Sequence, residues 1–153
     1  MVRWLLILLL IPLVILVISD VRNRSVSSMW LLTFGILNLI CMGITDGWKC
    51  VAVRTTGNIL LLLIIGLTLL TYAKVRHKRL PEMLGLGDVL FIIAASSAFG
   101  WAEYLKYIVL SSVVGILIWP LFRLVQPLKT GVPMVSVLAS VYIAALSYKL
   151  IMV

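Results

Sequence analysis

The stretch GNILLLLIIGLTLLTYA, residues 57–73, decides the fold class, because it continues without a charged side chain for long enough to cross a bilayer. A transmembrane α-helix needs about 17 to 25 such residues. Further apolar stretches lie on either side of it, separated by short polar segments. The sequence therefore predicts about six transmembrane helices, at roughly 4–19, 29–45, 57–73, 87–101, 105–125 and 132–152.

The composition of the chain agrees with this prediction. Of its 153 residues, 63% are hydrophobic and only 12% are charged, a balance that water-soluble globular domains do not have. Lipid can replace water around such a chain only when the backbone is hydrogen-bonded internally, in helices or in a closed barrel. Because the apolar residues come in long runs and do not alternate with polar ones, helices are favoured. We expect one all-α, polytopic membrane domain that spans residues 1–153.

The first apolar stretch has two interpretations. Arg3 precedes an uncharged apolar run, which is the pattern of a secretory signal peptide. However, no small-x-small cleavage site follows, and the chain continues directly into Ser19 and Asp20. We expect a retained helix, with a cleaved signal peptide as the alternative.

The positive charges predict an orientation. The formal net charge is +8, but Lys and Arg are spread over short loops, so a nucleic-acid partner is not expected. Cytoplasmic loops of membrane proteins are rich in Lys and Arg. The loops after the first, third and fifth predicted helices carry most of them: Arg22, Arg24, Lys74, Arg76, Lys78, Arg79, Arg123 and Lys129. This side is therefore expected to be cytoplasmic, and both termini are expected to lie on the other side.

The two cysteines offer little chemistry. Cys41 and Cys50 have neither metal-ligand spacing nor a histidine partner, so no metal and no cofactor is expected. Cys41 is expected to be a small buried apolar residue. A disulfide bond between the two in an oxidising compartment is the alternative.

The chain has few acidic residues, namely Asp20, Asp46, Glu82, Asp88 and Glu103. Asp20 ends the first predicted helix and Asp88 begins the fourth, so both are expected at the cytoplasmic membrane edge, with Asp46 and Glu103 on the opposite side. Two carboxylates at one site share a single proton near neutral pH. The ionised acid can then take a proton from water while the protonated acid donates to an amide carbonyl oxygen, and the amide is hydrolysed without a metal.

Each of the two acids also has a structural interpretation. Asp20 could form an ion pair with Arg22 or Arg24 at a helix end. Asp88 could be a helix-start acid that complements the helix dipole. Before it, Gly85 and Gly87 would let the backbone approach the acid and an extended substrate closely, since neither carries a Cβ atom.

These residues resemble the type IV prepilin peptidases, which are membrane aspartyl proteases of the Gly-x-Gly-Asp class. In that family the first catalytic Asp opens a stretch Asp-x-Arg-x-Arg-x-Ile-Pro-Asn, which Asp20-Val21-Arg22-Asn23-Arg24-Ser25-Val26 follows position by position. The second catalytic Asp closes Gly-x-Gly-Asp, which residues 85–88 match. Val132-Pro133-Met134 is similar to the Ile-Pro-Phe-like element at the start of the family's last helix.

The sequence departs from the family pattern in three places. Ser27 and Ser28 replace the family's Pro-Asn, and Leu90 stands where a Lys is common. These changes bear on substrate positioning and leave both acids in place. The cysteine-rich cytoplasmic insert of larger members is absent, so the chain resembles a minimal peptidase core, and the resemblance does not imply the N-methylation that larger members also perform.

The resemblance implies an aspartic endopeptidase of the cytoplasmic (inner) membrane that removes the leader of pilin-like precursor proteins at the cytoplasmic face. Its implied catalytic residues are Asp20 and Asp88, and its implied positioning residues are Gly85, Gly87, Arg22 and Arg24. The partners are the precursor and the lipid bilayer. Two alternatives stay open: a small transporter or channel whose acids bind a cation or proton, and a non-catalytic peptidase-like subunit of a secretion assembly.

Overall fold

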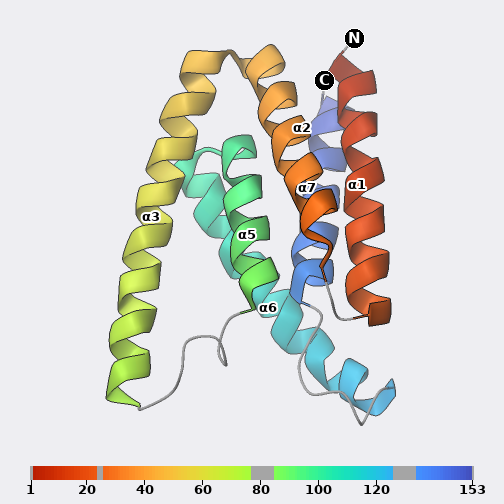
Figure 1. The fold of residues 1–153 in the computed structure, drawn as a ribbon. Helices are drawn as coiled ribbons and strands as arrows, with labels where there is room; N and C mark the ends of the chain where they lie inside the picture. Colours follow the sequence, from red (N-terminus) through yellow and green to blue (C-terminus); the bar gives the residue numbers. More distant parts are fainter. Residues whose placement is uncertain (1, 24–25, 77–84, 126–133, 153) are drawn as a thin grey trace.

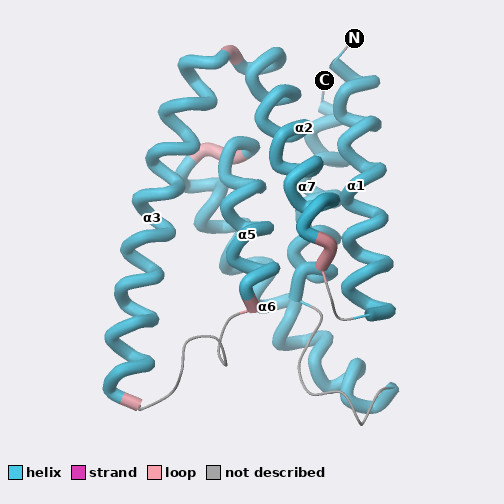
Figure 2. Tube along the Cα trace, viewed as in Figure 1, coloured by secondary structure: helices cyan, strands magenta, loops and turns pink. Residues whose placement is uncertain are grey.

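Helices make up nearly all of the described chain. The computed structural model describes all residues except 1, 24–25, 77–84, 126–133 and 153, and no strand occurs among those described (Figure 2). The all-α prediction is therefore confirmed for this part of the chain. Its helices are α1 (Val2–Asn23), α2 (Ser28–Asp46), α3 (Trp48–Val75), α5 (Leu86–Ala95), the 3-10 turn η1 (Ser96–Ala98), α6 (Trp101–Val125) and α7 (Met134–Met152).

Three stretches of the described helices are long and apolar enough to cross a membrane, namely Ser28–Asp46, Trp48–Val75 and Trp101–Pro120. Helix α5 has 10 residues, which gives a length of about 15 Å, half of a hydrocarbon core of about 30 Å. Figure 1 shows that α5 ends well short of the level of the turn between α2 and α3. The predicted fourth span is thus a short helix followed by η1, and the number of complete crossings stays a prediction.

The helices are arranged so that three chain segments meet at one end of the bundle. The turn between α2 and α3 lies at the other end, together with both termini (Figure 1). Its residue Gly47 has a φ of 87°, a conformation that glycine adopts without steric cost. The end of α1 and the starts of α5 and α7 all lie away from this turn. They carry the residues singled out from the sequence.

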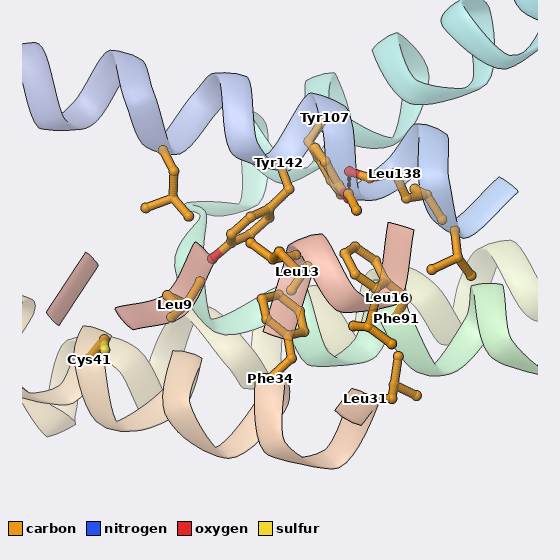
Figure 3. Close-up of a cluster of buried hydrophobic side chains, with 14 of the residues drawn as sticks. Leu9, Leu13, Leu16, Leu31, Phe34, Cys41, Phe91, Tyr107, Leu138 and Tyr142 are labelled. Atoms are coloured by element: carbon orange, nitrogen blue, oxygen red, sulfur yellow. Dashed lines mark hydrogen bonds between the residues drawn. The ribbon is translucent and has the colours of Figure 1, made fainter. Parts of the chain in front are cut away.

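Helix α1 is part of the core. It packs against α2 and α7, and Leu9, Leu13 and Leu16 are fully buried, because their spacing of four and three residues places them on one helix face. Figure 3 shows these leucines among the aromatic side chains of the core, where Phe34 stacks on Phe91 with ring centroids 5.0 Å apart.

The two cysteines differ in burial. Cys41 is buried with the core residues of α2, as expected from the sequence, whereas Cys50 is exposed on α3. The two do not form a disulfide bond. Cys41 therefore acts as a core residue in this structure.

The C-terminal end of α5 is fixed by side chains from α2 and α7. The last carbonyl groups of a helix have no partner within the helix, and in an apolar environment they need one from elsewhere. Asn38 donates from Nδ2 to the carbonyl oxygen of Ala94 at 2.9 Å and to Oγ of Ser97 at 3.0 Å. Tyr142 in turn donates to Oδ1 of Asn38 at 2.7 Å.

Helices α3 and α6 complete this arrangement. Asn58 donates from Nδ2 to the carbonyl oxygens of Ser96 at 2.7 Å and Phe99 at 2.9 Å. Tyr104 donates to the carbonyl oxygen of Ile92 at 2.6 Å. We call the four side chains that hold this end of α5 the α5 brace: Asn38, Asn58, Tyr104 and Tyr142. The brace sets the position of α5, and with it the position of Asp88 at the opposite end of this helix.

Candidate active site

Asp20 is a buried acid in the last turn of α1, with 6% of its surface exposed. Its Oδ2 atom accepts two hydrogen bonds from Ser136 on α7, one from the backbone N–H at 2.8 Å and one from Oγ at 2.8 Å. Asp20 forms no salt bridge with Arg22, which is exposed in the described structure. Asp20 is therefore held by α7 and not by the neighbouring arginine.

Asp88 lies in the first turn of α5, outside the three long apolar stretches. Its backbone N–H donates to the carbonyl oxygen of Gly85 at 3.1 Å, and its carboxylate accepts a hydrogen bond from the backbone of Gly85. Such reciprocal bonding caps a helix start. Asp88 is thus an acid in the first turn of a helix, as its structural interpretation states.

The environment of Asp88 nevertheless favours its protonated form. Burial, and then the negative charge of Asp20, raise the pKa of Asp88 from 3.8 to about 6, while the hydrogen bond from Gly85 acts in the opposite direction. Burial has this effect because a charged carboxylate loses its hydration, and a nearby like charge adds repulsion. The charge of Asp20 therefore acts on Asp88 although the two belong to distant segments of the chain.

Gly87 allows these segments to meet. A Cβ atom at position 87 would lie 3.1 Å from Cγ2 of Val26 and 3.7 Å from Cγ2 of Val135. Val26 belongs to the Asp20 stretch and Val135 follows directly after the Val132-Pro133-Met134 element. Gly87 therefore packs between the segments that follow α1 and begin α7.

Gly85 is important for the acid itself. A Cβ atom at this position would lie 2.8 Å from Oδ2 of Asp88, because the carboxylate folds back over the start of its own helix. Any larger residue would push the carboxylate away. The glycines of the Gly-x-Gly-Asp motif thus have separate tasks, one beside the acid and one at the packing contact.

The other candidates lie elsewhere or outside the described residues. Asp46 forms a salt bridge with Arg54 at 2.5 Å, next to the α2–α3 turn and therefore at the end of the bundle away from Asp20. Glu103 accepts a hydrogen bond from the backbone of Gly100 at 3.3 Å. Arg24 and Glu82 lie outside the described residues, as do Val132 and Pro133. Among the residues that the structure describes, no group of three or more His, Cys, Asp or Glu is arranged to hold a metal ion.

Ser136 was not found from the sequence. It lies three residues after Pro133 in an otherwise apolar helix start, and a lone serine in a membrane helix is too common to stand out. A signal was present in its position, since an N–H in the first turn of a helix has no partner within the helix. The structure shows that an acid 116 residues away supplies that partner.

The fold and the site together define a class: a helical protein with long apolar helices that brings a buried acid and a second, half-buried acid to one end of its bundle. The chain matches the model of the type IV leader peptidase family over residues 7–120, which is most of its length. It belongs to that family, which is a family of peptidases. Neither a curated protein nor a solved structure matches the chain.

Proposed function

We propose that this protein is a membrane aspartic endopeptidase that removes the leader peptide of type IV pilin-like precursors, with Asp20 and Asp88 as its catalytic pair. Membership of the leader peptidase family supports the reaction class. The observation that carries the assignment of residues is geometric: Gly87 packs between the segment after α1 and the start of α7, and Asp20 accepts two hydrogen bonds from that same start. A carboxyl group with a raised pKa near a second acid, as at Asp88, is typical of acid–base catalysis.

In this mechanism one acid is ionised and the other carries a proton. The ionised acid takes a proton from water, and the resulting hydroxide oxygen bonds to the carbonyl carbon of the scissile amide while the protonated acid donates to the carbonyl oxygen. The tetrahedral intermediate then collapses. The amide nitrogen leaves with the proton taken from water, and the second acid recovers its own proton from the intermediate. The net change is the addition of one water molecule across the amide bond.

The position of the pair suits such a substrate. Asp88 lies in the first turn of α5, and the start of α5 lies at the end of the bundle away from the α2–α3 turn (Figure 1). A precursor whose apolar segment lies in the membrane would present its leader junction at this level. We assign this end to the cytoplasmic face of the inner membrane, because Lys and Arg are concentrated in its loops. Arg22 is exposed two residues beyond Asp20 and is proposed, together with Arg24, to position the substrate backbone.

The test is cleavage of a panel of pilin-like precursors by the purified protein in liposomes, with products identified by mass spectrometry. The variants are Asp20→Asn and Asp88→Asn. The matched control is Asp46→Asn, which changes the one remaining aspartate of the chain; it lies at the other end of the bundle. We expect cleavage at one bond by the wild type and by the control, and none by the first two variants. Intact precursors throughout, or cleavage that survives either substitution, would overturn the proposal and direct attention to ion-flux assays.

A further inference from the structure

The two acids of the site differ in how many donors reach them. Oδ2 of Asp20 accepts both the backbone N–H and the hydroxyl of Ser136. The described interactions of the Asp88 carboxylate are one hydrogen bond from the backbone of Gly85, directly before α5, and the repulsion from Asp20. Hydrogen bonds to a carboxylate oxygen stabilise the charged form. The site is therefore asymmetric before any substrate is bound.

The direction of the backbone N–H of Ser136 is fixed by its helix. It belongs to the third residue of α7, whose N–H has no acceptor within its own helix and points out of the helix start. The positive end of the helix dipole lies at the same place and favours a negative charge. A bond from this N–H to a charged carboxylate oxygen is stronger than one to a neutral carboxyl oxygen, so the donor favours the ionised form of Asp20.

The hydroxyl donor of Ser136 has a choice of acceptors. Its single proton can go to Oδ2 of Asp20 at 2.8 Å or to the carbonyl oxygen of Val17 at 3.4 Å. The shorter bond to a carboxylate is the stronger while Asp20 is charged. If Asp20 became neutral, the hydroxyl could turn to Val17. The stabilisation from this hydroxyl is therefore tied to the negative charge of Asp20.

Few other charges are present on the elements around the pair. Helix α5 carries no charged residue besides Asp88, and the charged residues of α2 and α7 are Asp46 and Lys149, both near the far ends of those helices. On α1, Arg22 is exposed and forms no salt bridge with Asp20 in the described structure. Among the described residues, Ser136 is therefore the donor that distinguishes the two acids.

We propose that Ser136 is a positioning residue that holds Asp20 as the ionised member of the pair and leaves the shared proton on Asp88. This inference rests on the proposed function for its catalytic meaning. It assigns the two roles of the mechanism: Asp20 takes the proton from water, and Asp88 donates to the carbonyl oxygen. Burial, and then the charge of Asp20, raise the pKa of Asp88, which agrees with a proton on Asp88.

The chain allows a direct test because it contains only three aspartates, namely Asp20, Asp46 and Asp88. Protein labelled with 13C at the aspartate side-chain carboxyl gives three NMR signals in detergent, which the three Asp→Asn variants assign. A pH titration then shows which acid takes up the proton nearest neutrality. We expect this step on the Asp88 signal. If the protonation step nearest neutral pH appeared on the Asp20 signal and not on the Asp88 signal, the proposal would be overturned.

Variants of Ser136 test its part in this assignment. In Ser136→Ala we expect the Asp20 signal to share the step near neutrality, and in Ser136→Thr, which keeps the hydroxyl, the wild-type pattern should return. Ser147→Ala is the matched control, since Ser147 lies on the same helix and bonds to Ile143. Unchanged curves in Ser136→Ala would overturn the role of Ser136. If this variant does not fold, the wild-type titration still decides which acid is ionised.

The titration needs no substrate, so its outcome is separate from that of the cleavage assay. Where precursor is cleaved, we expect Ser136→Ala to lower kcat by roughly tenfold to a hundredfold, the range for loss of a hydrogen bond to a charged group. The acid limb of its pH profile should move to higher pH. A purely structural role would lower the amount of folded enzyme and leave the shape of the profile unchanged, which would also contradict the proposal.

Discussion

The two ends of α5 are built in opposite ways. At its C-terminal end, carbonyl groups that a helix leaves without partners accept hydrogen bonds from Asn38 and Asn58 of the α5 brace. At its N-terminal end, Asp88 is half-buried, and this burial, followed by the charge of Asp20, raises its pKa. At one end side-chain donors satisfy backbone carbonyl groups, whereas the other end keeps a carboxyl group in an unfavourable environment.

This difference suggests a division between stability and reactivity. A buried carboxylate beside another costs free energy and persists only where the surrounding structure holds it in place. The brace supplies such support from four other helices, because Asn38, Asn58, Tyr104 and Tyr142 belong to α2, α3, α6 and α7. Changes at the N-terminal end should therefore affect catalysis most, and changes at the brace should affect folding most.

The largest effect is expected from Asp88→Asn. Loss of a general acid lowers rates by about a hundredfold to ten-thousandfold, so cleavage should fall at least that far. The thermal unfolding temperature should not fall, because the amide removes an unfavourable charge. Cleavage kinetics and thermal unfolding in the same detergent check both parts. If Asp88→Asn lost activity only because it unfolds, the proposed division of α5 into a catalytic end and a stabilising end would be contradicted.

The brace should show the reverse pattern. Asn38→Leu leaves the carbonyl oxygen of Ala94 and the hydroxyl of Tyr142 without their described partner, and a buried polar group in this state costs about 1 to 3 kcal/mol. We expect a loss of that order in the free energy of unfolding, measured by denaturant titration in detergent. Thr68→Val is the control, since Thr68 is exposed and bonds only within α3. Equal losses in the two variants would argue against the brace.

The pH dependence tests the N-terminal end. The pKa of Asp88 in the folded chain, about 6, lies above its ordinary value of 3.8, so the folded state holds this proton where the unfolded state releases it. The contribution of Asp88 to stability therefore falls as pH rises from about 4 to about 6. Thermal unfolding across this range should show a fall in the wild type that is smaller in Asp88→Asn. The same fall in both would mean that another group is responsible.

The rate of cleavage should depend on the same proton of Asp88. If protonated Asp88 is the acid, kcat/KM should decrease by up to about tenfold per pH unit above pH 6. The measurement is the rate of precursor cleavage at low substrate concentration between pH 5 and pH 9. A rate that stays constant through this interval would exclude Asp88 as the proton donor in the free enzyme.

The smallest effect is expected at the packing contact. Gly87→Ala places a Cβ atom 3.1 Å from Cγ2 of Val26, so the start of α5 must shift by a few tenths of an ångström and cleavage should fall several-fold. Adding Val26→Ala should restore part of the rate. Gly66→Ala is the control, because a Cβ atom at position 66 meets nothing within 4 Å. A rate in Gly87→Ala equal to that of the control would show that this contact does not position Asp88.

Much of this arrangement was accessible from the sequence. The all-α fold of the described residues, the core role of Cys41 and the placement of Asp46 away from Asp20 follow from apolar runs and polar breaks, because the membrane leaves few alternatives to helices. The family was indicated by the Asp20 stretch and the Gly-x-Gly-Asp motif, and the match over residues 7–120 confirms it.

Other features depend on tertiary contacts that spacing does not encode. The early end of α5 is stabilised by Asn38 and Asn58, which in the sequence are isolated polar residues within apolar runs. Ser136 binds Asp20 across the whole length of the chain. Neither partner could be assigned without knowing which helices are neighbours.

The central claim is that Asp20 and Asp88 meet at one site, and cross-linking tests it most directly. In protein with both native cysteines replaced, the pair Asp20→Cys and Asp88→Cys would be treated with a short bifunctional thiol reagent, and the digested peptides would be analysed by mass spectrometry. The control pair is Asp20→Cys and Asp46→Cys, at opposite ends of the bundle. We predict efficient cross-linking of the first pair and none of the control. Failure of the first pair to exceed the control would contradict the account.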